Sequence, residues 1–171
     1  MDKINFAFES FKNIQDLIKF VDQKSSAVLV VAGLIFTGYI QFLQGLTFSL
    51  TEGLTYYGIT TFIASIATLI SLLLVVHISI FKVLKPRKAK HYAKEDTSLF
   101  YYEHLAKVGK ESVLETYKTI DTDIMLKNII DQQHEVSKIL KEKTAELGKS
   151  FNWLFASIVS VILFIIFSIQ L

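Results

Sequence analysis

Three long apolar segments limit the folds open to this sequence: Ala27–Leu50, Ile59–Leu84 and Phe151–Leu171. The last of them contains no charged residue, and about 20 such residues are what a helix needs to cross a bilayer. Hydrophobic residues make up 51% of the chain, and a water-soluble domain rarely combines such a fraction with such clustering. We therefore expect an all-α membrane protein with three transmembrane helices.

The longest predicted helix runs from Asp121 to Leu171. Asp121 and Asp123 both suit a helix N-cap, and no Pro or Gly follows them until Gly148. Two neighbouring rows with a spacing of seven form an apolar face in its first half: Leu126, Gln133, Leu140 and Leu147, and beside them Ile129, Val136 and Lys143. The pattern predicts a last cytosolic helix that is continuous with the last membrane span.

Residues 1–25 have the pattern of an amphipathic, cytosolic helix. Its apolar residues keep a spacing of three or four: Ile4, Phe8, Phe11, Ile14, Ile18 and Val21. Charges scattered through the segment, and an apolar block that comes too late, do not fit a secretory signal peptide. The helix would pack on the other cytosolic helices or lie in the membrane interface.

Residues 26–84 predict a two-span transmembrane hairpin. In the first span, Gly33 and Thr37 form a small-residue pair at which another helix can approach closely. The second span carries hydroxyl residues largely along one side: Thr60, Thr61, Ser65, Thr68, Ser71 and Ser79. Such a stripe packs against another helix or, alternatively, lines a polar path across the membrane. His77, near the end of this span, is expected close to the interface.

The placement of basic residues predicts the orientation. Of the 18 Lys and Arg residues, those before the first span are Lys3, Lys12, Lys19 and Lys24, and the rest lie between Lys82 and Lys149. Because basic residues stay on the cytoplasmic side, the N-terminus and residues 85–150 should be cytosolic, with the C-terminus outward. Residues 85–150 would form a helical sensor region, and residues 151–171 the third span of a multi-pass protein of the cell inner (plasma) membrane.

A basic run follows the second span: Lys82, Lys85, Arg87, Lys88, Lys90 and Lys94. It either sets the topology and touches anionic lipid or forms a phosphate-binding patch. Pro86 should end the helix of the second span. Asp96 can cap a helix that begins near Thr97, Gly109 interrupts, and residues 111–118 predict another helix.

Enzyme chemistry finds no support in the sequence. We find neither a phosphate-binding glycine loop nor the zinc-protease or nucleophilic-serine motifs. The four histidines lack metal-ligand spacing, and the chain has no Cys, which excludes disulfides and thiol catalysis. We expect no enzyme, no metal and no cofactor.

The candidate ligand-binding residues are polar groups on or beside the apolar face of the long helix, together with two members of the basic run: Gln132, Gln133, His134, Lys138 and Lys143, and Arg87 and Lys88. In a coiled coil such residues set the register or solvate a flank. Gathered at one level, they would bind an anionic, hydrogen-bonding ligand, since Lys supplies charge to a phosphate and an amide can read a base edge.

Three motifs resemble one known family: Asp22-Gln23-Lys24, Leu99-Phe100-Tyr101-Tyr102, and Asp131-Gln132-Gln133-His134-x-x-Ser137-Lys138-Ile139-Leu140 followed by Lys143. They are similar to segments of the Pycsar membrane effectors, small bacterial proteins of antiphage defence. The resemblance implies a partner pyrimidine nucleotide cyclase that makes cyclic CMP (cCMP) or cyclic UMP (cUMP) on infection. The effector then senses the nucleotide and impairs the inner membrane, causing abortive infection. Some similar proteins accompany cyclic-oligonucleotide systems instead.

The expected mechanism places the cyclic nucleotide between the N-terminal helix, the basic segment and the long helix. Arg87, Lys88, Lys138 or Lys143 would meet the phosphate, and Gln132, Gln133 or His134 would read the base. Binding would reorganise a homo-oligomer in contact with membrane lipid, with no nucleic acid involved. The alternatives are a membrane-anchored helical adaptor and a constitutive, holin-like channel or toxin.

Overall fold

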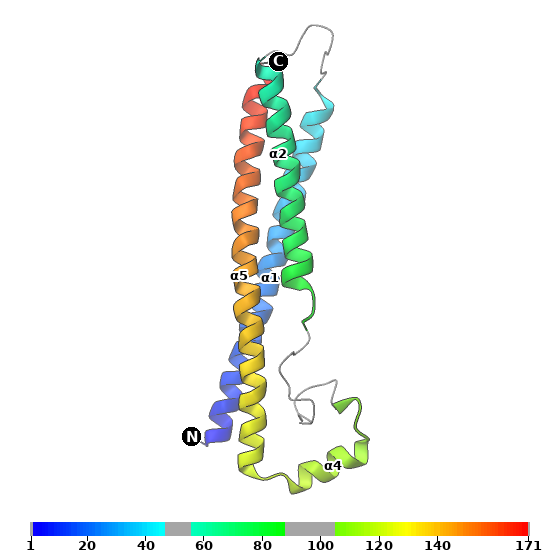
Figure 1. The fold of residues 1–171 in the computed structure, drawn as a ribbon, viewed down its shortest axis with the longest axis vertical. Helices are drawn as coiled ribbons and strands as arrows, with labels where there is room; N and C mark the ends of the chain where they lie inside the picture. The colour runs from blue at the N-terminus through cyan, green and yellow to red at the C-terminus, as the bar shows by residue number, and fades with distance from the viewer. Residues whose placement is uncertain (1, 47–55, 88–104, 171) are drawn as a thin grey trace. The chain divides into compact units, whose positions relative to one another are not determined.

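A computed structural model describes residues 2–46, 56–87 and 105–170, which contain helices and no strand. The helices are α1 (Lys3–Gln44), α2 (Tyr56–Ile78), the π-helix η1 (Ser79–Leu84), α4 (Lys110–Thr119) and α5 (Thr122–Ser168) (Figure 1). Three helical stretches are long and apolar enough to cross a membrane: α1, α2 with η1, and α5. The predicted all-α class with three candidate spans is confirmed.

Helix α5 confirms that the last helix before the membrane and the last span are one element, 47 residues long. Asp121 precedes its first residue, and the Asp121 carboxylate accepts a hydrogen bond from the Thr122 backbone N–H at 2.7 Å. The Asp121 carbonyl accepts another from the Met125 N–H at 2.9 Å. These bonds fit the expected helix start, because early backbone N–H groups lack partners within the helix.

Helix α1 also crosses a boundary that the sequence suggested. It runs unbroken for 42 residues, so the amphipathic segment and the first apolar segment belong to one helix. Ser25 and Ser26 lie inside it, and the Ser26 hydroxyl donates to the Asp22 carbonyl at 3.1 Å. This bond satisfies the hydroxyl within its own helix, so the serine pair does not interrupt α1.

The chain divides into two compact units, to which both α1 and α5 contribute. Unit 1 comprises Met1–Phe20 and Pro86–Glu142, and unit 2 comprises Val21–Lys85 and Lys143–Leu171. The core of unit 1 joins the start of α1 to the start of α5 through Ala7, Phe11, Ile129 and Val136. The predicted apolar faces of these two segments therefore pack on each other. Helix α4, close to its predicted bounds of 111–118, contributes no buried residue.

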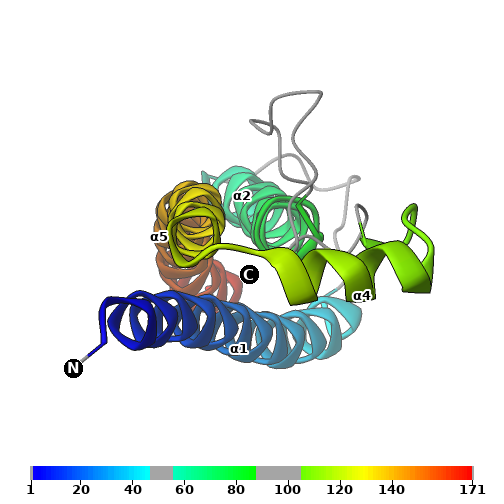
Figure 2. The same cartoon turned by 90° about the horizontal axis from the view of Figure 1, so that it is seen from below.

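In unit 2 the later parts of α1 and α5 run in the same direction, and α2 with η1 runs in the opposite one (Figures 1 and 2). Tyr39, Ala64 and Phe164 bring the three helices together in one apolar cluster. The Tyr39 and Phe164 rings meet edge to face, with centroids 5.3 Å apart. Helix η1 ends at Leu84, just before Pro86, as the sequence predicted.

Helix α2 places its polar side inward and its apolar side outward. Its buried residues include Thr61, Ser65, Thr68 and Ser71, whereas Phe62, Ile63, Ile66, Ile70 and Leu73 are exposed. In water this arrangement would be unfavourable, because the large apolar side chains would remain solvated. It suits hydrocarbon, where outward-facing apolar groups lose nothing and polar groups seek partners inside. In the packed arrangement the hydroxyl stripe therefore faces the interior of unit 2, as the packing interpretation predicts.

Gly33 and Thr37 lie on an exposed side of α1. A Cβ atom added at Gly33 or at nearby Gly38 would meet no described atom within 4 Å. The Thr37 hydroxyl donates to the Gly33 carbonyl at 3.0 Å, within the same helix. Among the described residues, no helix of the same chain makes the expected close approach at this pair.

Candidate functional site

A groove in unit 1 lies between the start of α1 and the start of α5. It has a volume of about 490 Å³ and is lined by Lys3, Phe6, Ala7, Ser10, Leu126, Ile130 and Gln133. This volume falls within the range of small-molecule sites, and so does the mixture of apolar walls with a few polar groups. Phe6 and Ile130 are well exposed, so the apolar part of the groove is accessible.

Gln133 is the candidate residue that lies in this groove. Its side-chain amide N–H donates to the Ser10 hydroxyl at 2.9 Å. The bond fixes the amide between α1 and α5, and its carbonyl oxygen keeps its capacity to accept. Lys3 adds a cation to the same lining. Together these groups offer a ring face, a hydrogen-bonding amide and hydroxyl, and a positive charge.

Sequence reasoning named Gln133 but missed Lys3, Phe6 and Ser10. Of these three, Ser10 could have been suspected from the sequence, because it is a polar residue close to the apolar positions Ala7, Phe11 and Ile14 of the amphipathic segment. A polar group there is expected to find a partner on the helix that covers that face. Its partner could not be identified, because Gln133 lies far along the chain.

The two residues beside Gln133 have different surroundings. Gln132 is buried, and its side-chain carbonyl oxygen accepts no hydrogen bond among the described contacts. His134 is exposed. Successive residues on a helix point about 100° apart, so these three side chains do not converge on one ligand from a single helix face. Gln132 or His134 could contact the same ligand as Gln133 only if residues from other segments completed the site on their sides of the helix.

The two basic candidates of unit 1 that the structure describes, Arg87 and Lys138, already pair with carboxylates. Arg87 pairs with Glu142 of α5. Lys138 lies 3.4 Å from the Glu135 carboxylate, one turn away on the same helix. A phosphate meeting either cation would have to share it with that carboxylate or displace it. Lys88, and with it Lys90, Lys94 and the helix expected near Thr97, lies outside the described residues.

Lys143 belongs to unit 2 and is almost fully buried there, with its side chain 6% exposed. Its ammonium donates to both carboxylate oxygens of Asp22, at 2.6 and 2.9 Å. Two close bonds from a buried ammonium to one carboxylate make a strong, charge-assisted pair between α5 and α1. The resting partner of Lys143 is therefore Asp22.

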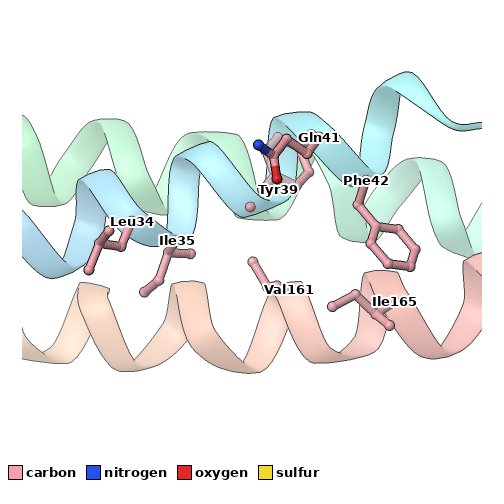
Figure 3. Close-up of a pocket in the computed structure, with 8 residues that line it drawn as sticks. Leu34, Ile35, Tyr39, Gln41, Phe42, Val161 and Ile165 are labelled. Carbon is pink, nitrogen blue, oxygen red and sulfur yellow. The ribbon is translucent and has the colours of Figure 1, made fainter.

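A second groove lies in unit 2, between α1 and α5, and is largely apolar. Its volume is about 510 Å³, and its lining includes Leu34, Ile35, Tyr39, Phe42, Val161 and Ile165 (Figure 3). Gln41 contributes an amide side chain to this groove. Within residues 2–46, 56–87 and 105–170, no three His, Asp or Glu side chains gather where a metal ion could bind.

A comparison with protein-family models identifies the family of this chain. The family model described as the Pycsar effector protein domain, PycTM, matches residues 6–170, nearly the whole chain. No curated protein and no solved structure matches the chain significantly. The matched range includes every lining residue of the unit 1 groove except Lys3, and it covers the three candidate spans apart from the first residues of α1. The chain therefore belongs to the Pycsar effector family, whose members are non-enzymatic transmembrane effectors of cyclic-nucleotide-signalled antiphage defence.

Proposed function

We propose that this chain senses cCMP or cUMP through unit 1 and then impairs the integrity of the bacterial inner membrane through its three spans. The cell would stop growing before phage are released, which is abortive infection. A pyrimidine nucleotide cyclase activated by infection would supply the nucleotide. The groove that contains Gln133 is the observation that carries the sensing part of this proposal.

The groove chemistry suits a cyclic pyrimidine nucleotide in three respects. Phe6 offers an exposed ring on which a base can stack. Gln133 and Ser10 supply an amide and a hydroxyl that can bond to the polar edge of the base. Lys3 offers a positive charge to the cyclic phosphate. Arg87 and Lys138 are further proposed phosphate contacts, and a phosphate would have to compete there with the carboxylates of Glu142 and Glu135. Lys88, which lies outside the described residues, is a third proposed phosphate contact.

We propose that nucleotide binding changes how the membrane-spanning helices assemble. A ligand drives such a change only by binding one arrangement more tightly than the other. We propose a homo-oligomer, because three spans cannot enclose an aqueous pore alone. The exposed Gly33, Thr37 and Gly38 of α1 would let a second copy approach closely. In the proposed orientation, unit 1 is cytosolic and can meet the nucleotide.

The test is direct binding of cCMP and of cUMP to the full chain in detergent micelles by isothermal titration calorimetry. Gln133→Leu keeps the side-chain volume and removes the amide. We expect it to raise the Kd about tenfold, the value of one good hydrogen bond. His134→Leu is the matched control, because it changes the exposed neighbour, and its Kd should stay within about twofold of the wild type.

If His134→Leu raises the Kd and Gln133→Leu leaves it unchanged, the binding site lies on the exposed face of α5 instead. Binding of neither nucleotide would refute sensing of these nucleotides and favour an adaptor or an ungated toxin. A potential-sensitive dye separates these two, because only the toxin depolarises cells that lack the cyclase.

A further inference from the structure

One row of residues along α5 is buried throughout unit 2 and is mostly polar. Lys143, Ser150, Ser157 and Phe164 follow one another at a spacing of seven, and each is 5% exposed or less. The same spacing marks one face of a helix that packs on its neighbours. The predicted row of Ile129, Val136 and Lys143 thus continues beyond unit 1, but with hydroxyls where a packing row normally carries large apolar side chains.

The other two helices of unit 2 place polar groups against this interior. The Ser79 hydroxyl of η1 and the Ser150 hydroxyl are 2.7 Å apart. The Tyr39 hydroxyl of α1 lies 2.6 Å from the Ser65 hydroxyl of α2. The remaining buried polar residues of these helices are Ser25, Thr61, Thr68 and Ser71. All three helices therefore turn hydroxyls inward.

These hydroxyls exceed what the packed bundle can satisfy. Thr68 and Ser157 donate to carbonyls of their own helices, at 2.9 and 2.7 Å. Ser25 and Thr61 are fully buried, and within the described part of the chain their hydroxyl oxygens have no hydrogen-bond partner. Small apolar residues would pack as closely without leaving any polar group unpaired. The interior is thus more polar than the packed arrangement requires.

We propose that these buried hydroxyls form the lining along which water and small monovalent ions cross the membrane when the helices of unit 2 separate, so that the packed bundle is the closed state. This inference rests on the proposed function and specifies the path by which ions would cross the membrane. Separated helices would present Ser150, Ser157 and Thr68 to water, and hydroxyl oxygens hold a water column that apolar walls would expel. Several copies together would surround the path.

The chain contains no Cys, so single cysteines report the lining without further engineering. Ser157→Cys and Thr68→Cys place nearly isosteric thiols in the interior of α5 and α2. Val159→Cys and Leu69→Cys are matched controls on the exposed, lipid-facing sides of the same helices. Cells carrying each variant, with and without an active pyrimidine cyclase, are treated with a membrane-impermeant cationic thiosulfonate while a dye follows the membrane potential.

When the cyclase depolarises the membrane, the two interior cysteines should be modified at least about tenfold faster than the two controls. The reason is that a thiol in water ionises to the reactive thiolate, whereas a thiol in hydrocarbon does not. Equally slow modification of all four cysteines in depolarised cells overturns the lining. If the active cyclase leaves the membrane potential unchanged and all four cysteines react slowly, the gating in the proposed function is refuted instead. Rapid interior modification without any effect of the cyclase supports the lining and instead refutes nucleotide gating.

Discussion

Lys143 shows at the scale of one residue how the same side chain can suit two roles. Its place in the apolar row of a long helix, next to polar candidates, made it a possible phosphate contact. In the folded chain it is buried and bound to both oxygens of Asp22. A buried pair of this kind contributes little net stability, but it strongly penalises the loss of one partner, because the other charge is then left uncompensated. The pair therefore joins α1 to α5 at a contact that is costly to break from one side.

We expect Asp22→Asn to lower the free energy of unfolding by up to about 3 kcal/mol, the lower end of the usual range because Asp22 is 34% exposed. The thermal unfolding midpoint in detergent micelles measures this. Asp16→Asn, which breaks the exposed pair with Lys19, is the control and should change the same quantity by no more than about 0.5 kcal/mol. The double variant Asp22→Leu with Lys143→Met should recover most of the stability lost in Asp22→Asn. If Asp16→Asn lowers the free energy of unfolding as much as Asp22→Asn does, the assignment of a buried pair is contradicted.

At the scale of the element, α5 continues without a break through Gly148, a residue of low helix propensity. Gly148 is exposed, and a Cβ atom added there would meet no atom of the described residues within 4 Å. Ser150 and Leu147, on either side, are buried, so the packed face does not depend on the glycine. Nothing in the packing therefore requires a glycine at this position.

Gly148→Ala should raise the free energy of unfolding by up to about 1 kcal/mol, because alanine loses less backbone entropy in a helix. The thermal midpoint in micelles, followed by circular dichroism at the helix band, is the measurement. Gly148→Pro should lower it by about 3 kcal/mol or more through the lost hydrogen bond and the steric clash. If alanine lowers the midpoint instead, the helix must bend or be approached closely at this residue.

At the scale of the whole molecule, the proposed function depends on the side of the membrane on which each segment lies. We propose from the placement of the basic residues that the N-terminus and residues 85–150 lie in the cytosol, with the C-terminus outside. The proposed sensing role depends on this orientation, since a nucleotide made inside the cell must reach unit 1.

Intact cells treated with an impermeant maleimide should leave Lys110→Cys unmodified and should modify Gln170→Cys. Both residues are exposed in the fold, so burial cannot account for a difference between them. After the cells are opened, both cysteines should react. Modification of Lys110→Cys in intact cells would reverse the orientation and contradict cytosolic sensing.

Much of the architecture could be predicted because it depends on local chemistry. Apolar length predicts spans, and a run without Pro or Gly from Asp121 to Gly148 predicts one helix, since both features act through the backbone and its immediate neighbours. Pro86 marks the end of a helix for the same reason. The hydroxyl stripe of α2 was also readable, because a helix brings every third or fourth residue to one side.

The sequence by itself therefore determined the class of the protein, its three candidate spans and the continuity of its last helix. The tertiary structure alone decided that Gln133 meets Ser10, that Lys143 meets Asp22 and that Ser150 meets Ser79. These partners come from segments far apart in the chain, and their pairing depends on how the helices are rotated and shifted against one another. Such rotation and register follow from the packing of whole helix faces, which no local pattern specifies.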